Sequence, residues 1–181
     1  MRSKLEIESE LCLLRWRQGD VPAFDALVRL WERRLFYYLR RVVVSEEDAW
    51  DVLQEVWTTV WRSGSSLRDT AVFRTWVYRI AHNCGVSHLR RQRRHETIQE
   101  AYEEPALPDA PSFDDEDAAR IHAALEQLPS GHREVLTLFF LEEFSHSEVA
   151  EILDIPVGTV KSRLYYAKRA LRDRLDSETT P

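Results

Sequence analysis

Apolar residues recur at intervals of three and four along most of this chain. This spacing is typical of amphipathic helices that bury one face in a core. Sustained alternation of apolar and polar residues between turns, the mark of a half-buried strand, is missing from the sequence. The pattern therefore predicts an all-α protein.

The first half of the chain predicts a small bundle of four helices. The expected helices are one through Leu11 and Leu14 that stops near Gly19, one from Asp20 and Pro22 to Val42, one from the N-cap Ser45 to Gly64, and one over about 72–94. The expected core residues are Phe24, Leu27, Val28, Trp31, Leu35, Tyr38, Leu39, Val42, Ala49, Val52, Leu53, Val56, Trp57, Val60, Phe73, Trp76, Val77, Ile80, Ala81 and Cys84.

The second half predicts a helix-turn-helix. Helices are expected at 118–128, 131–143, 146–153 and from 157 onward, the last with an apolar face of Val160, Leu164, Ala167, Leu171 and Leu175. Ser145 and Glu148 have the spacing of a capping box. Small Ala150 lies where two helices would cross, and apolar Ile155 lies in the turn between them, as the motif requires.

An acidic segment separates the two halves. Residues 96–117 hold nine acids, three prolines and no Lys or Arg, whereas residues 1–95 carry a net charge of +5 and residues 118–181 one of −2. Such a composition favours a linker. We therefore expect a domain at 1–95, a linker at 96–117 and a second domain at 118–181. The total charge of −6 hides two basic helix faces.

Three polar helix faces are candidate binding surfaces. The helix over 72–94 carries Arg79, Asn83, Ser87, Arg90 and Arg94 on one side, with Arg91 and Arg93 beside them. The last helix shows Thr159, Lys161, Ser162, Arg163, Tyr165, Lys168 and Arg169, which are suited to base edges and phosphates. The third helix presents Asp48, Asp51, Glu55 and Thr58, with Gln54 at the flank. Each face has a plainer interpretation as solvated surface, and the acidic face has the alternative of docking on a basic helix.

Several functional classes find no support in the sequence. Carboxylates without nearby His, Lys or phosphate-binding loops are poor signs of acid–base catalysis, so we expect no enzyme, no cofactor and no metal site. Cys12 and Cys84 lie in apolar helical patterns and are expected to be small core residues. The chain lacks a long apolar run and a signal-peptide pattern, which indicates a cytoplasmic protein without membrane insertion.

Three stretches together resemble the extracytoplasmic-function sigma factors of the sigma-70 family. They are residues 47–61, EDAWDVLQEVWTTVW; residues 73–94, FRTWVYRIAHNCGVSHLRRQRR; and residues 128–171, LPSGHREVLTLFFLEEFSHSEVAEILDIPVGTVKSRLYYAKRAL. The resemblance covers nearly the whole chain in the family's order. It implies a sigma region 2 domain that binds core RNA polymerase and the −10 element, and a sigma region 4 domain that binds the −35 element. The protein would then direct polymerase to promoters and assist −10 melting.

The resemblance also assigns roles to individual residues. It implies docking on the clamp helices of the polymerase's largest subunit by Asp48, Asp51, Gln54 and Glu55. It implies −10 DNA binding by Ser66, Leu67, Arg68, Arg79, Asn83, Arg90 and Arg91, with Asn83 at a pocket for a flipped base. Independently of the resemblance, the helix pattern makes Trp76 and Tyr78 candidates for bracing an unstacked base, with a core position as the alternative for a tryptophan at helical spacing. The resemblance implies −35 binding by Thr159, Lys161, Ser162, Arg163 and Tyr165. Ser87 and Tyr166 depart from the residues common at their positions, so promoter preference is not transferred.

The same resemblance implies further partners. The polymerase flap, promoter DNA and an anti-sigma factor are expected, and the anti-sigma factor would be able to hold the protein at the membrane. The acidic linker would imitate nucleic acid in a basic polymerase channel, with a plain tether as the alternative. A stand-alone helix-turn-helix regulator with a helical interaction domain is the competing functional class.

Overall fold

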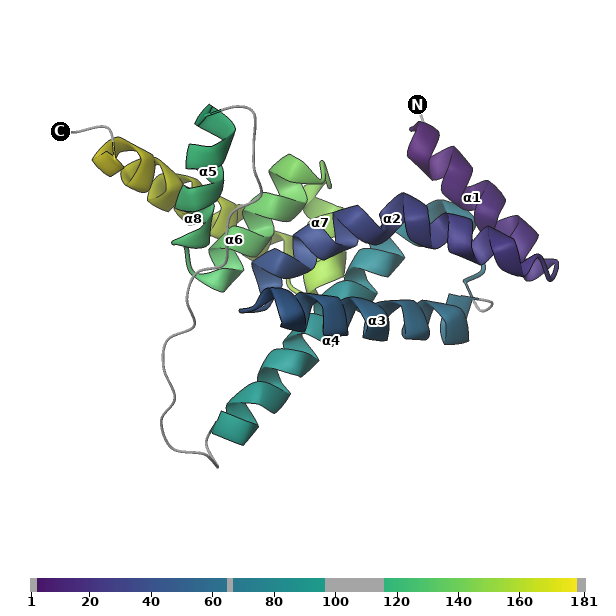
Figure 1. The fold of residues 1–181 in the computed structure, drawn as a ribbon. Coiled ribbons are helices and arrows are strands. Elements are labelled where there is room, and N and C mark those ends of the chain that lie inside the picture. The colour runs from purple at the N-terminus through teal and green to yellow at the C-terminus, as the bar shows by residue number, and fades with distance from the viewer. Residues whose placement is uncertain (1–2, 65–66, 97–115, 179–181) are drawn as a thin grey trace. The chain divides into compact units, whose positions relative to one another are not determined.

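The computed structural model describes residues 3–64, 67–96 and 116–178, and within these ranges it contains helices and no strand. The all-α prediction is confirmed. The helices fall into two compact units, within Met1–Ala101 and Tyr102–Pro181 (Figure 1). The predicted linker lies mostly at 97–115, outside the described residues, so the domain boundaries at 95 and 118 stay predictions.

The first unit consists of four α-helices and one 3₁₀ turn. These are α1 (Lys4–Arg17), α2 (Val21–Val42), α3 (Glu46–Ser63), η2 (Thr70–Val72) and α4 (Phe73–Glu96). Helix α2 packs against α1, α3 and α4, and α3 also packs against α4. In Figure 1 the C-terminal part of α4 continues beyond the other helices of this unit. The last turns of α4 therefore extend past the core of the unit.

The core of this unit follows the predicted stripes with five exceptions. Trp31, Leu35, Tyr38, Val52, Val56 and most of the other expected residues are buried. The exceptions are half-buried: Val28, Trp57, Trp76, Ile80 and Cys84. Cys12 is also half-buried, so the prediction that both cysteines are core residues was wrong. On α1 the buried leucine is Leu13, whereas Leu11 and Leu14 are exposed.

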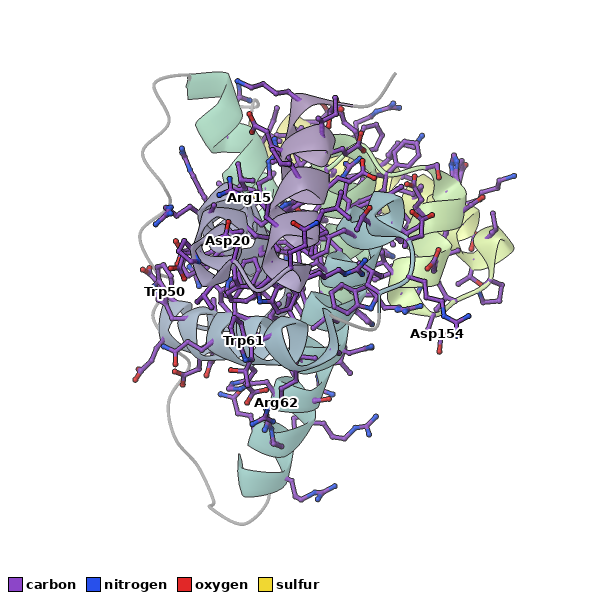
Figure 2. All side chains as sticks on the ribbon, turned by 90° about the vertical axis from the view of Figure 1, so that its right-hand side faces the viewer. Arg15, Asp20, Trp50, Trp61, Arg62 and Asp154 are labelled. Carbon is purple, nitrogen blue, oxygen red and sulfur yellow. The ribbon has the colours of Figure 1, made fainter. Side chains whose placement is uncertain are left out.

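Helices α2 and α3 begin in different ways. Ser45 forms a capping box with Asp48 at the start of α3, as its sequence position predicts. Asp20 precedes α2 but makes no cap bond; its carboxylate instead pairs with the Arg15 guanidinium at 2.7 Å (Figure 2). The start of α2 therefore depends on Pro22 in its first turn and on this ion pair to α1.

Two glycines in the first unit mark close approaches between elements. A Cβ on Gly64 would lie 2.6 Å from the Trp16 ring, and one on Gly85 would lie 2.8 Å from a Val42 methyl group. Gly64 thus allows close packing of α3 on α1, and Gly85 allows close packing of α4 on α2.

The second unit contains the predicted helix-turn-helix. Its elements are α5 (Glu116–Glu126), α6 (Ser130–Leu136), a π-helical segment η3 (Thr137–Leu141), α7 (His146–Leu153) and α8 (Val157–Glu178). The Ser145–Glu148 capping box is present, and Asp154 closes α7 in the left-handed conformation with φ 51°. Val160, Leu164 and Ala167 of α8 are buried as expected.

One helix of this unit differs from the prediction. The expected regular helix over 131–143 widens into the π-helical turn and ends at Leu141, after which Glu143 takes a positive φ of 54°. The extra residue in a π turn rotates the side chains that follow it. Phe140 and Leu141, within this turn, are exposed.

Candidate functional surfaces

The acidic side of α3 is exposed at three of its four predicted residues. Asp51, Gln54 and Glu55 are all exposed, and they lie one helical turn apart or less. They line a shallow hollow of about 650 Å³ whose opposite wall comes from α4 and the end of α3. That wall is basic, with Arg62, His88 and Arg91. Figure 2 shows Arg62 beside Trp61 at one end of α3 and Trp50 at the other.

The fourth residue, Asp48, does not belong to this exposed surface. Its side chain is only 18% exposed, and both oxygens are engaged: Oδ1 lies 2.8 Å from His88 Nε2, and Oδ2 accepts the Ser45 N–H at 3.3 Å. Asp48 is therefore less accessible to a partner than the other three residues, and its docking role stays a prediction. Its carboxylate caps α3 and joins it to α4.

Electrostatics support the structural role of Asp48. Partial burial alone would raise the pKa of this carboxyl group, but hydrogen bonds from Ser45 and His88, with the charge on His88, outweigh that effect. The net result is a pKa below the usual value for aspartate. The folded state therefore favours the ionised carboxylate.

A second link between α3 and α4 joins residues predicted for different surfaces. Arg91 donates from Nη2 to both oxygens of Glu55, at 2.8 and 2.9 Å. The sequence assigned Glu55 to protein docking and Arg91 to DNA. The structure brings them together although 36 residues separate them in the chain.

The basic side of α4 is exposed as predicted. Arg79, Asn83, Ser87, Arg90 and Arg94 are all exposed. A second hollow of about 350 Å³ lies on this side, lined by Asn83, Cys84, Ser87, Arg90, Arg91 and Glu55. Because Glu55 and Arg91 line both hollows, their ion pair forms the ridge between the acidic and basic surfaces. Partial burial raises the pKa of the Cys84 thiol, so the floor of this hollow is not a reactive thiolate.

The two aromatic residues of α4 that were candidates for bracing a base, Trp76 and Tyr78, differ in their burial. Tyr78 is fully buried against Tyr38 and Trp31, with ring centroids 5.2 and 6.3 Å away, so it cannot brace a base. Tyr78 lies one turn before the core residue Ala81, on the face of α4 that meets α2. The prediction that Tyr78 could brace a base was therefore wrong. Trp76 is half-buried.

The loop between α3 and η2 is described only in part. Ser66 lies outside the described residues, and Arg68 is exposed. Leu67 is only 8% exposed, and its backbone N–H donates to Gly64 O at 3.3 Å. The Leu67 side chain therefore anchors the loop and does not fit the prediction that it contacts DNA.

The predicted base-reading residues of α8 lie on its outer side. Lys161, Ser162 and Tyr165 are exposed, and Thr159 and Arg163 are half-buried. Tyr165 is 62% exposed and forms an edge-to-face pair with exposed Tyr166 at 5.3 Å. A helix that follows a capped helix and a tight turn, with exposed donors and rings, has the form of a major-groove reader.

The second unit also carries an apolar groove that sequence reasoning missed. The groove has a volume of about 440 Å³ and lies between α5, η3 and α8, with Ile121, Phe140, Leu141, Leu171 and Leu175 among its lining residues. Two of these, Phe140 and Leu141, follow from the π-helical turn. The sequence contained no clear signal for it, because the regular periodicity predicted a helix through Glu143.

His88 is the other functional residue that the sequence analysis missed. It lies one turn before Arg91 on α4, so the sequence could show that the two share a face, but its partner Asp48 is 40 residues away.

The described residues contain no cluster of His, Cys, Asp and Glu suited to a metal ion. Among them, no helix is long and apolar enough to cross a membrane.

Comparisons with protein families match both units. The family model described as Sigma-70 region 2 matches residues 27–95, and the model described as Sigma-70, region 4 matches residues 118–171. The RNA polymerase sigma-H factor of Pseudomonas aeruginosa is 32% identical over 170 residues, covering 87% of this chain and 88% of that protein. The ECF RNA polymerase sigma-E factor of Haemophilus influenzae is 30% identical over 183 residues, covering 94% and 96%.

Solved structures that share the fold include two complexes. The sigma factor RpoE in complex with the anti-sigma factor NepR from Bartonella quintana has a TM-score of 0.76 and 22% identity, covering 86% of this chain and 98% of that one. CnrH in complex with the cytosolic domain of CnrY has a TM-score of 0.68 and 24% identity, covering 95% and 99%. At these identities the structures support the arrangement of helices.

Proposed function

Because this chain belongs to the sigma-70 family, in its extracytoplasmic-function group, we propose a specific role for each of its exposed surfaces. The chain is an RNA polymerase sigma factor: it binds RNA polymerase and confers promoter specificity. It is an initiation factor and not an enzyme, since the polymerase supplies the chemistry. The stand-alone regulator is not favoured, because both sigma regions are matched in order.

The exposed acidic side of α3 would bind the clamp helices of the largest polymerase subunit. The observation that supports this is the row of Asp51, Gln54 and Glu55, which face solvent and not the core of their unit. Carboxylates in a shallow hollow suit a partner helix that carries basic side chains. Asp48 would act indirectly, by holding α3 against α4.

The basic side of α4 would bind the −10 element. Arg79, Arg90 and Arg94 are exposed on one face and would contact phosphates. Asn83 lines a hollow with a partly apolar floor, which suits an unstacked base that needs both a hydrogen bond and packing. Arg68 from the preceding loop is exposed and would extend this surface.

Helix α8 would lie in the major groove of the −35 element. Lys161, Ser162 and Tyr165 would face bases, and Thr159 and Arg163 would lie nearer the phosphates. The apolar groove beside α8 would receive the polymerase flap, since Phe140 and Leu141 offer an exposed apolar anchor there. This would fix the second unit on polymerase while α8 reads DNA.

An anti-sigma factor is a further proposed partner. The two solved structures described above are a complex with an anti-sigma factor and a complex with the cytosolic domain of CnrY. The chain would work in the cytoplasm, free or held at the membrane by that factor. The acidic segment at 96–117 would imitate nucleic acid in a basic polymerase channel.

Transcription with purified components tests this function. The protein would be mixed with core RNA polymerase and genomic DNA of its host, and the 5′ ends of the transcripts would be mapped. We expect start sites that share −35 and −10 sequences and that disappear without the protein. A protein that neither binds core polymerase nor changes the start sites would contradict the proposal.

A further inference from the structure

The ion pair between Glu55 and Arg91 lies where two binding surfaces meet. Arg91 holds both carboxylate oxygens of Glu55 at 2.8 and 2.9 Å, and each residue lines the hollow on either side. The two side chains remain 55% and 45% exposed, so both are accessible to a partner. A macromolecule that approaches either hollow therefore meets the same two side chains.

The pairing limits what each residue offers to a partner. Both contacts come from one guanidinium nitrogen, Nη2, so Glu55 offsets the positive charge of Arg91 and engages one of the nitrogens that a phosphate would bind. Conversely, a basic side chain from a docking helix would compete with Arg91 for Glu55. A phosphate at Arg91 or a basic side chain at Glu55 would therefore compete with this ion pair.

We propose that the Glu55–Arg91 pair couples the two surfaces: in the free protein Glu55 masks Arg91, and docking of a basic partner on Glu55 releases Arg91 to bind a DNA phosphate. This inference rests on the proposed roles of α3 and α4. By linkage, DNA bound at Arg91 also strengthens docking at Glu55 by the same factor. The Asp48–His88 contact keeps α3 and α4 aligned while the pair opens.

The size of the coupling follows from the exposure of the pair. Exposed ion pairs of this kind correspond to about a 1.5- to 5-fold change in an equilibrium constant. One released arginine adds about one phosphate contact, which steepens the salt dependence of binding by a slope of about 0.7 on single-stranded DNA. Both quantities are measurable on the purified protein.

The first test measures the affinity of the free protein for mixed-sequence single-stranded DNA by fluorescence anisotropy at several salt concentrations. Glu55→Gln should bind this DNA about two- to five-fold more tightly than the wild type, and its affinity should depend more steeply on salt concentration. The control is Glu47→Gln, which changes the net charge equally on the same helix about 12 Å away along its axis. If both variants gained the same DNA affinity, the gain would come from the change in net charge alone, and the proposal would be overturned.

The second test compares Arg91→Ala in the free protein and in purified holoenzyme. In the free protein Arg91 is masked, so its loss should leave DNA affinity within about 1.5-fold of the wild type. In holoenzyme the same change should weaken DNA binding by a factor of about three or more and reduce the salt slope. The double variant Glu55→Gln with Arg91→Ala should lose the gain seen for Glu55→Gln. Equal weakening by Arg91→Ala in both states would overturn the coupling.

These outcomes separate the coupling from the proposed function itself. If the wild-type protein directs promoter-specific initiation but Glu55→Gln and Glu47→Gln behave alike, the coupling is wrong and the sigma function stands. If the wild-type protein fails to bind core polymerase while Glu55→Gln still gains DNA affinity, the masking stands and the assignment of the docking partner is wrong.

Discussion

The two units of this sigma factor build their binding surfaces in different ways. In the second unit the capping residue Ser145, the left-handed Asp154 and the exposed Tyr165 all lie within one short stretch of chain. In the first unit the surface depends on contacts between α3 and α4 that join residues 36 and 40 positions apart. A local motif is readable from the sequence, whereas a surface assembled from distant helices depends on how they pack.

The largest effect is expected from removing the centre of the first core. Trp31 is 1% exposed, donates to Ser9 Oγ at 2.7 Å and contacts Phe73 and Tyr78 edge to face. Trp31→Ala should lower the free energy of unfolding of the first unit by about 3–5 kcal/mol. The rate of backbone amide hydrogen exchange should then rise in α1–α4 and stay unchanged in α5–α8. The control is Trp50→Ala, whose ring is 43% exposed. Faster exchange throughout both units would show that they do not fold independently.

The next largest effect is expected at the docking surface. Replacing both Asp51 and Glu55 with Lys should weaken core polymerase binding about 100-fold, because like charges would then face a basic partner. The helix content should not change, since both side chains are exposed. Binding is measured by surface plasmon resonance, with Lys161→Ala as a control on the other unit. Unchanged affinity of the double variant would remove α3 from the docking surface.

A smaller and more selective effect is expected on α8. Lys161→Ala should reduce discrimination at one −35 position by about 1–3 kcal/mol if the lysine contacts a base edge. Transcription from a library of randomised −35 sequences measures this. Arg169→Ala should instead weaken all sequences about equally, as a phosphate contact does. A promoter profile identical to that of the wild type would exclude Lys161 from base reading.

Capping residues provide a direct comparison of the two units. Ser145→Ala removes a local cap and should cost about 1 kcal/mol of unfolding free energy. Asp48→Ala removes both a cap bond and the contact with His88, so it should cost about 1–2 kcal/mol. Chemical denaturation of each variant measures the difference. A cost for Asp48→Ala no greater than that of Ser145→Ala would mean that the His88 contact adds no stability.

The smallest predicted effect is the acid sensitivity of this same contact. The pKa of Asp48 is lowered on folding, so the unfolded state binds the proton more tightly. The stabilisation is fully present above the unfolded pKa of about 4 and is lost as the pH falls through the lower folded pKa. Asp48→Asn should therefore show a weaker loss of stability between about pH 5 and pH 2 than the wild type. Parallel pH profiles for the two proteins would contradict this role for Asp48.

Sequence patterns predicted most of the fold because its helices carry strong local signals. The stripe of Leu27, Trp31, Leu35, Tyr38 and Leu39 is buried as expected, and the capping boxes at Ser45 and Ser145 are present. The exceptions occur where one turn of helix can face either the core or solvent. Tyr78 is the clearest case, since it was assigned to a DNA surface and lies fully buried against α2.

The candidate surfaces were predicted as separate sets because periodicity identifies which face a residue occupies and not what lies opposite it. The exposed residues Asn83, Arg90 and Lys161 lie where their helix positions indicated. The apolar groove depends on the π-helical turn at Thr137–Leu141, which no spacing rule revealed. Leu67 and Asp48 were assigned to binding, but Leu67 is buried and the Asp48 carboxylate is engaged by Ser45 and His88.

The sequence by itself determined the helices, the helix-turn-helix and the family, because each depends on residues close together in the chain or on motifs in order. Only the tertiary structure decided that Asp48 pairs with His88 and Glu55 with Arg91. The physical reason is that packing of α3 on α4 selects which of many charged side chains come within hydrogen-bonding distance. That choice turns the acidic side of α3 and the basic side of α4 into neighbours that share one ion pair.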